Sequence, residues 1–206
     1  MLAPSTRALI AFFDALAPRW NAMQSADRYE RLARQLAPHA ALFRDARLGL
    51  DIGTGTGAFL PHLARLAPHA QVIALDLSPV MLRMARASNG RDIVRAWLQG
   101  DVHRLPLPGA CADLITCHNS FAHFEDSPAA LRELARALMP GGTLFILHDI
   151  AREQVNAIHA STDSPRVRRH VLPPVEFAAA QVASAGFEVF CADDTPDHYL
   201  IIARRP

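Results

Sequence analysis

Lysine is absent from this sequence of 206 residues, so its 21 basic side chains are all arginines, and 20 acidic side chains nearly balance them. The net charge of +1 gives no overall attraction to nucleic acids or to membrane surfaces. The three cysteines are an odd number at no metal-ligand spacing, which argues against the disulfide framework of a secreted protein. The first twenty residues have neither a basic start nor a long apolar run, which argues against a signal peptide or a membrane span. We therefore expect a cytoplasmic protein that binds neither nucleic acids nor membranes.

Half of the residues are hydrophobic and a fifth are charged, as in an ordinary globular protein. Residues 5–43 carry apolar side chains three or four positions apart, which predicts helices, and Pro18 and Pro38 are expected to break them. From Leu48 onward, short apolar runs alternate with helical stretches, which is typical of a mostly parallel sheet. We divide the chain into an N-terminal helical cap segment, residues 1–45, and one α/β domain, residues 46–206.

The apolar runs predict seven strands. They are expected at Leu48–Ile52, Gln71–Leu75, Ala96–Leu98, Asp113–Cys117, Thr143–Leu147, Phe187–Cys191 and Tyr199–Ala203. Only a short polar stretch separates the last two, so they must pair antiparallel. Ser-Pro pairs at 78–79 and 127–128 mark helix starts, and residues 139–142 mark a helix end before the fifth strand. The predicted fold is a doubly wound, seven-stranded, mostly parallel sheet with an antiparallel C-terminal strand pair and an N-terminal helical segment.

A glycine-rich turn follows the first predicted strand, where residues 51–57 read Asp-Ile-Gly-Thr-Gly-Thr-Gly. Glycine permits positive φ and lets a ligand lie against the backbone. Such a turn serves dinucleotides as well as other nucleoside cofactors, so the glycines alone leave the cofactor open. Asp76, at the end of the second strand, could accept hydrogen bonds from both hydroxyls of a ribose. Asp101 and Val102, after the third strand, place an acid and an apolar side chain where an adenine would lie.

These motifs, together with residues 105–108 and 138–142, resemble those of the class I, Rossmann-like methyltransferases. The closest resemblance is to the branch that contains the ubiquinone/menaquinone-biosynthesis enzymes and many small-molecule methyltransferases. It covers roughly Phe12 to the C-terminus. It implies that S-adenosylmethionine is the cofactor and that a small molecule accepts its methyl group.

The resemblance also implies a role for individual residues of this chain. Those of the first turn would line the methionine end of the cofactor, namely Asp51, Gly53, Thr54, Gly55 and Gly57. Asp76 would hold the ribose, and Leu77, Asp101 and Val102 would contact the adenine. His118 would border the sulfonium. Trp20 stands where the family's N-terminal segment more usually has a tyrosine, and we expect it beside the substrate.

Transfer of a sulfonium methyl group depends mainly on positioning, because the group is already activated and is displaced in line. A base within reach helps if the acceptor carries a proton, and histidine suits this task. His118, His123 and His148 follow the fourth and fifth strands, at the sheet edge where ligands bind in open α/β folds. We expect them to surround the acceptor, with His123 or His148 as base. The same residues with His159 could instead hold a metal, although their spacing matches no compact metal motif.

Two segments near residue 160 are further candidates for acceptor contacts. Arg152 and His159 share the polar face of a predicted helix whose other face carries Val155 and Ile158. The polar loop that follows carries three arginines, and two of them, Arg166 and Arg169, could hold a carboxylate or phosphate on the acceptor. A solvated surface turn explains the loop equally well.

Two other functions remain open at this point. An NAD(P)-dependent oxidoreductase of the same architecture explains the glycines and Asp76 but not Asp101 or the terminal strand pair, and without lysine it has no Tyr-x-x-x-Lys dyad. A non-catalytic, nucleoside-binding regulatory subunit would keep the same binding residues. The acceptor is not specified by the sequence, and both a monomer and a homodimer are compatible with it.

Overall fold

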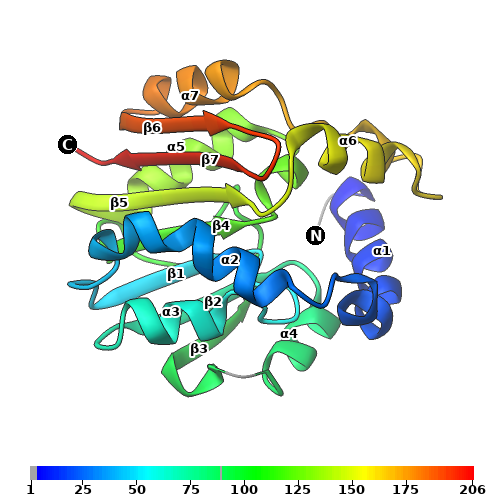
Figure 1. Ribbon diagram of the computed structural model, residues 1–206, viewed down its shortest axis with the longest axis horizontal. Coiled ribbons are helices and arrows are strands. Elements are labelled where there is room, and N and C mark those ends of the chain that lie inside the picture. Colours follow the sequence, from blue (N-terminus) through cyan, green and yellow to red (C-terminus); the bar gives the residue numbers. More distant parts are fainter. Residues whose placement is uncertain (1–3, 89) are drawn as a thin grey trace.

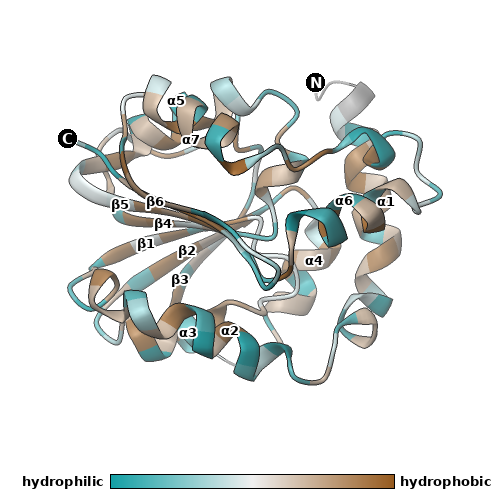
Figure 2. Ribbon diagram, turned by 45° about the horizontal axis from the view of Figure 1, so that its top comes forward, coloured by the Kyte–Doolittle hydropathy of each residue, from teal (hydrophilic) through white to brown (hydrophobic). Residues whose placement is uncertain are grey.

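The computed structural model describes residues 4–88 and 90–206. A single sheet runs through the molecule with helices on both of its faces (Figures 1 and 2). Its strand order is β3-β2-β1-β4-β5-β7-β6. The strands are β1 (Leu48–Ile52), β2 (Gln71–Asp76), β3 (Val94–Gln99), β4 (Ala112–His118), β5 (Leu138–His148), β6 (Glu188–Asp194) and β7 (Tyr199–Arg204). The first five pair in parallel, and β7 runs antiparallel to both β5 and β6. This confirms the predicted fold.

Two helices cover each face of the sheet (Figure 2). The first face carries α2 (Arg28–Leu36) and α3 (Leu60–Leu66), and the second carries α5 (Ser127–Ala137) and α7 (Val175–Ser184). Neighbouring residues of a strand point to opposite faces, so Phe145 packs in the core with α2 and α3 while Ile146 packs in the core with α5 and α7. Burial on both faces explains why the central strands read as continuous apolar runs.

The remaining helices lie at one end of the sheet, beyond the carboxyl ends of the parallel strands (Figure 1). They are α1 (Pro4–Trp20), α4 (Pro79–Ala85) and α6 (Arg152–Ala160). Helix α1 packs against α4, although about sixty residues of chain separate them. These helices therefore enclose the edge where the sequence places its candidate site. None of the helices in the described part of the chain has the length and apolar character needed to cross a bilayer.

Of the two predicted helix breaks, one is wrong and one is confirmed. The predicted break at Pro18 is wrong, because α1 continues through this residue to Trp20. At Pro18 the helix lacks the hydrogen bond that an N–H would donate to the carbonyl oxygen of Asp14, and it ends two residues later. The predicted break at Pro38 is confirmed, since α2 ends at Leu36. Helix α5 begins at Ser127, and the side chain of Asp126 caps it by accepting the N–H of Ala129 at 2.9 Å.

The fifth strand is longer than predicted. It begins at Leu138 directly after α5, instead of at Thr143. Residues 139–142 interrupt the regular pairing with β4, because Ala112 pairs with Leu138 and Leu114 already pairs with Thr143. Gly141, within this interruption, has a φ of 79°. The N–H of Gly141 donates to the carbonyl of Arg205 at 2.7 Å, so the residue directly after β7 continues the pairing with β5 here.

Candidate functional site

A cavity of about 390 Å³ lies at the carboxyl ends of the parallel strands. The strand order reverses between β1 and β4, and such a reversal opens a crevice in which open α/β sheets bind their ligands. Most of the predicted cofactor residues line its wall: Gly53, Thr54, Gly55, Asp76, Leu77, Asp101, Val102 and His118. Asp51 and Gly57 do not line it.

The turn after β1 is shaped for close approach to the backbone. Gly53, Gly55 and Gly57 all have positive φ, at 71°, 55° and 85°. A Cβ added to Gly53 would lie 2.4 Å from the Cβ of Ser120, which leaves no space for a larger residue. The N–H of Gly53 donates to the carbonyl of Leu75 at 2.8 Å, which ties the turn to the end of β2. The turn is thereby fixed in the shape that glycine alone adopts without strain.

Asp76 holds this turn against the start of α4. Its Oδ2 accepts the N–H of Gly55 and its Oδ1 accepts the N–H of Ser78, both at 2.8 Å. Burial raises the pKa of Asp76 to about 6, although the two backbone hydrogen bonds act in the opposite direction. A carboxylate has about four acceptor positions, so each oxygen can still accept a bond from the cavity. The carboxylate is thus oriented for two neighbouring hydroxyl groups.

Asp51 lies beneath the turn. The hydroxyl of Thr116 donates to its Oδ1 at 2.8 Å, while its Oδ2 has no hydrogen-bond partner among the described residues. Burial raises the pKa of Asp51. The carboxylate of Asp51 is enclosed beneath the turn and does not reach the cavity.

Beyond β3, Asp101 is paired with a residue that the sequence analysis missed. The Nδ1 of His103 lies 2.5 Å from the Oδ1 of Asp101, and His103 also lines the cavity. The N–H of Asp126 donates to the Nε2 of His103 at 3.2 Å, so the ring proton is on Nδ1 and faces Asp101. The hydrogen bond of this pair lowers the pKa of Asp101 and raises that of His103.

A buried ion pair closes the inner side of the site. Asp149, which follows β5, lies 2.9 Å from the guanidinium of Arg28, and its second oxygen accepts a bond from the side chain of Asn119. Burial alone would raise the pKa of Asp149, but His118, Arg28 and Asn119 outweigh it and hold the pKa well below its usual range. Arg28 lines the cavity, and nothing in its local sequence marks it. Asn119 has a φ of 53°, a backbone strain typical of functional sites.

The N-terminal segment closes the outer side. Trp20 and Phe13 both line the cavity. The hydroxyl of Thr56 donates to Asn21 at 2.6 Å, and that of Ser78 donates to Asp14 at 2.5 Å. The segment is thus bonded to both the glycine turn and the start of α4.

Among the predicted catalytic histidines, His118 and His123 reach the cavity and His148 does not. The ring of His118 stacks on Phe59, with centroids 5.0 Å apart. His123 contacts Phe13 edge to face at 5.1 Å, and burial first, then the neighbouring histidines, lower its pKa well below its usual value. His148 is 2% exposed, packs edge to face against Tyr199 and does not line the cavity. Burial lowers the pKa of His148 to about 3, so this ring is neutral.

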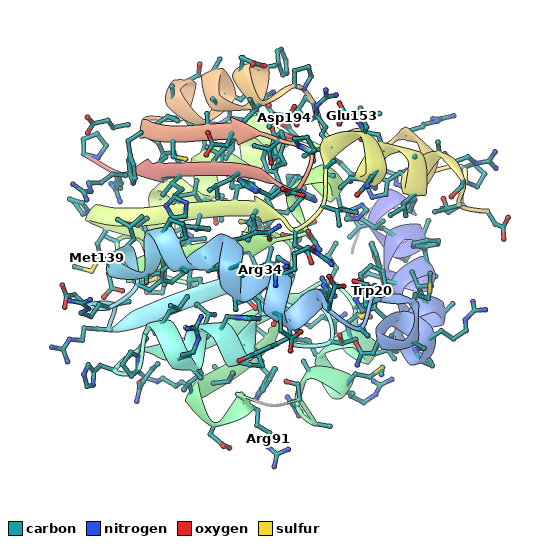
Figure 3. All side chains as sticks on the ribbon, viewed as in Figure 1. Trp20, Arg34, Arg91, Met139, Glu153 and Asp194 are labelled. Atoms are coloured by element: carbon teal, nitrogen blue, oxygen red, sulfur yellow. The ribbon has the colours of Figure 1, made fainter. Side chains whose placement is uncertain are left out.

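The predicted acceptor contacts near residue 160 are mostly engaged elsewhere. Arg152 does not line the cavity, because its guanidinium pairs with Asp194 at 2.6 Å and with Glu153. Asp194 ends the edge strand β6 and Glu153 lies at the start of α6, and both lie away from Trp20 (Figure 3). Arg166 pairs with Glu125, which does line the cavity.

The faces of α6 also differ from the prediction. His159 is buried on the same side as Val155, and the ring of His123 packs against it with centroids 4.7 Å apart. Ile158, expected on the apolar face, is 53% exposed. Arg169 is exposed and does not reach the cavity. In the described part of the chain, no three His, Cys, Asp or Glu side chains are grouped so that they could hold a metal ion.

Known proteins that resemble this chain in sequence include methyltransferases. A family described as "Methyltransferase domain" matches residues 50–146. The demethylmenaquinone methyltransferase of Deinococcus radiodurans is 35% identical over 144 residues, which cover 68% of this chain and 60% of that protein. Residues 50–146 carry a methyltransferase domain. The whole chain spans 60% and 63% of the length of two curated demethylmenaquinone methyltransferases, from Deinococcus radiodurans and Thermus thermophilus.

The fold of this chain also occurs in solved structures of other proteins. A S-adenosylmethionine-dependent methyltransferase from Aquifex aeolicus superposes with a TM-score of 0.67 at 20% identity, covering 91% of this chain and 97% of that one. The [4+2]-cyclase SpnF superposes with a TM-score of 0.76 at 20% identity, covering 100% of this chain and 98% of that one. At such identities the likeness concerns the fold alone, and the cyclase shows that the fold hosts more than one reaction.

Proposed function

We propose that this chain is an S-adenosylmethionine-dependent methyltransferase that transfers a methyl group to a small molecule. The observation that carries the proposal is the carboxylate of Asp76. It is fixed by the N–H groups of Gly55 and Ser78 and faces a cavity at the point where the strand order reverses. A ribose with two free hydroxyls matches its two remaining acceptor positions.

The surrounding residues fit the rest of an S-adenosylmethionine molecule. The adenine would lie between Leu77 and Val102, with Asp101 as the acceptor for a polar edge. The methionine end would lie along Gly53 and Gly55, where the missing side chains leave the backbone open. Asp51 would act from beneath this turn, because its enclosed carboxylate does not line the cavity.

The chemistry required of the protein is then mainly positioning and exclusion of water. Phe13 and Trp20 cover the acceptor side of the cavity, and His118 borders it from β4. His123 is the residue we assign as base, because it is the neutral imidazole that reaches the cavity next to Phe13. His148, the other candidate base, is enclosed away from the cavity and would act only on the packing of the strand end.

The setting of this activity follows from the same features. The cavity has a volume of about 390 Å³, which lies within the range of small-molecule sites. The three cysteines are free thiols, which supports a reducing compartment, and we place the protein in the cytoplasm. A near-neutral charge supports an acceptor other than nucleic acid, and the protein would act as a monomer or a homodimer.

A labelled-methyl experiment tests the proposed activity. The protein is incubated with S-adenosylmethionine carrying a labelled methyl group and with an extract of small metabolites, and the products are separated. We expect label in a small molecule and formation of S-adenosylhomocysteine in equal amount. H123A should lower the transfer by about a hundredfold and leave donor affinity unchanged, as expected for loss of a base. Donor binding without any transfer, across a broad set of metabolites, would instead support the regulatory subunit.

A further inference from the structure

Three histidines from separate segments meet at the acceptor side of the cavity. They are His123, which follows β4, His159 on α6, and His170 in the loop before α7. The Nδ1 atoms of His123 and His170 are 2.9 Å apart, and the Nδ1 of His159 is 2.7 Å from the carbonyl oxygen of His170. Of the three, only His123 lines the cavity.

The proton positions in this cluster follow from the chemistry of the partners. A carbonyl oxygen only accepts, so the Nδ1 of His159 carries a proton and holds the backbone of His170 in place. Between His123 and His170, one Nδ1 must donate and the other must accept. Which of them donates decides whether the other nitrogen of His123 offers a lone pair or a proton to the cavity.

Glu125 resolves this choice. Its Oε1 lies 3.9 Å from the Nε2 of His170, and its negative charge favours a proton on that nitrogen. The Nδ1 of His170 is then an acceptor, so the Nδ1 of His123 donates. Arg166 pairs with Glu125 and holds its carboxylate in position.

The remaining nitrogen of His123 is therefore the unprotonated one. This Nε2 has no hydrogen-bond partner among the described residues, and it is not fully enclosed by protein atoms. Because the ring lines the cavity, we infer that this nitrogen opens to it. The titratable groups that face the pair are His148, His159, Glu125 and Arg166. Burial is the main reason why the pKa values of both His123 and His170 are lowered, so both rings are neutral at neutral pH.

We infer that His170, oriented by Glu125, is a positioning residue that fixes the tautomer of His123 and so presents the lone pair of its Nε2 to the methyl acceptor. The use of this lone pair rests on the proposed function. The acceptor's proton passes to the Nε2 of His123, the methyl carbon bonds to the acceptor atom, and the electron pair of the broken carbon–sulfur bond remains on S-adenosylhomocysteine. The proton on the Nδ1 of His123 stays in its bond to His170.

Nitrogen NMR of the histidine rings tests this assignment without any donor or acceptor. Long-range proton–nitrogen spectra of histidine-labelled protein distinguish protonated from unprotonated ring nitrogens, and the signals missing in H123Q identify His123. We expect a protonated Nδ1 and an unprotonated Nε2 in the wild-type protein. H170F keeps a ring but removes the acceptor, and it should shift His123 toward the tautomer with its proton on Nε2. H170N restores an acceptor oxygen near the same place and should restore the wild-type signals.

Two further variants complete the experiment. E125Q removes the charge but not the bulk, and it should shift the His123 signals in the same direction as H170F, which provides the test if H170F does not fold. H69F changes an exposed histidine in the same way and should leave the His123 signals unmoved. A proton on the Nε2 of His123 in the wild-type protein, or His123 signals that do not respond to H170F and E125Q, would overturn the inference. A lack of methyl transfer would leave these spectra unchanged, so the two proposals fail separately.

Activity adds a second readout. With a known acceptor, H170F should lower kcat by about tenfold or more, with little change in KM for S-adenosylmethionine, and H170N should recover most of the loss. A purely structural role would instead change KM and stability and would not be rescued by asparagine.

Discussion

Replacement of His62 by phenylalanine should make the protein less sensitive to acid. His62 lies on α3 and is fully enclosed, with both ring nitrogens lacking a hydrogen-bond partner among the described residues. Its ring stacks on Tyr29, with centroids 4.4 Å apart. Burial first, then His118 and two nearby arginines, lower its pKa from 6.5 to about 4.

The sign of the effect follows from the two states. The folded pKa lies below the unfolded value, so the unfolded chain takes up a proton first as the pH falls. Above about pH 6.5 the ring is neutral in both states and does not affect the free energy of unfolding. As the pH falls from 6.5 toward 4, the unfolded chain is protonated and the folded protein is not, so stability is lost. Between pH 7 and pH 5 this loss amounts to about 1 to 2 kcal/mol of unfolding free energy, the lower figure allowing for solvent screening.

Urea unfolding at pH 7 and at pH 5, followed by circular dichroism, measures this difference. H62F retains the stacking ring and has nothing to protonate, so it should lose about 1 to 2 kcal/mol less than the wild-type protein between the two conditions. H69F makes the same change at an exposed position and should behave as the wild type. Other buried groups titrate too, among them His148 and Asp76, but they are common to all three proteins and cancel in the comparison. The reasoning is refuted if H62F loses as much stability as the wild type, or if H69F loses equally little.

Three further substitutions test the site and its surroundings. G53A should prevent cofactor binding and destabilise the fold by about 1 kcal/mol or more, because the new Cβ would lie 2.4 Å from the Cβ of Ser120 and residue 53 has a positive φ. Calorimetry measures the binding and thermal unfolding the stability, and normal cofactor affinity would contradict the prediction. D149A should cost about 3 to 5 kcal/mol of unfolding free energy, since it leaves a buried arginine unpaired; a loss below about 1 kcal/mol in urea unfolding would show that water reaches the pair. R152A should change stability by less than about 1 kcal/mol and leave cofactor affinity and turnover unchanged, because its partner Asp194 lies away from the cavity; a clear loss of turnover would restore it to the acceptor site.

The sheet and the cofactor side of the cavity could be predicted because their signals are local. A run of apolar residues predicts a strand, and the glycine turn is predicted by seven consecutive residues, 51–57. Asp76 and Asp101 lie at strand ends, and strand ends of a parallel sheet meet at one edge. The position of these residues thus follows from the order of elements along the chain.

The acceptor side could be predicted only in part, because its contacts join distant segments. Arg152 and Asp194 are 42 residues apart, and no local pattern shows that they pair. His170 lies 47 residues from His123, and its local sequence shows only a polar loop. The histidine content of the region was visible, but which ring faces the cavity depends on how α6 and the following loop pack. The early start of β5 at Leu138 was missed for the same reason. Gly141 and Gly142 exchange backbone hydrogen bonds with Arg205, which is more than sixty residues away in the sequence.

Calorimetric titration with S-adenosylmethionine, S-adenosylhomocysteine and a nicotinamide dinucleotide tests the central claim most directly. We expect both adenosyl compounds to bind with one site per chain and the dinucleotide not to bind. D76A should weaken binding of both by about tenfold or more, because it removes charged hydrogen bonds to the ribose, whereas D92A, at an exposed acid, should not. No heat with either adenosyl compound, together with clear binding of the dinucleotide, would contradict the account.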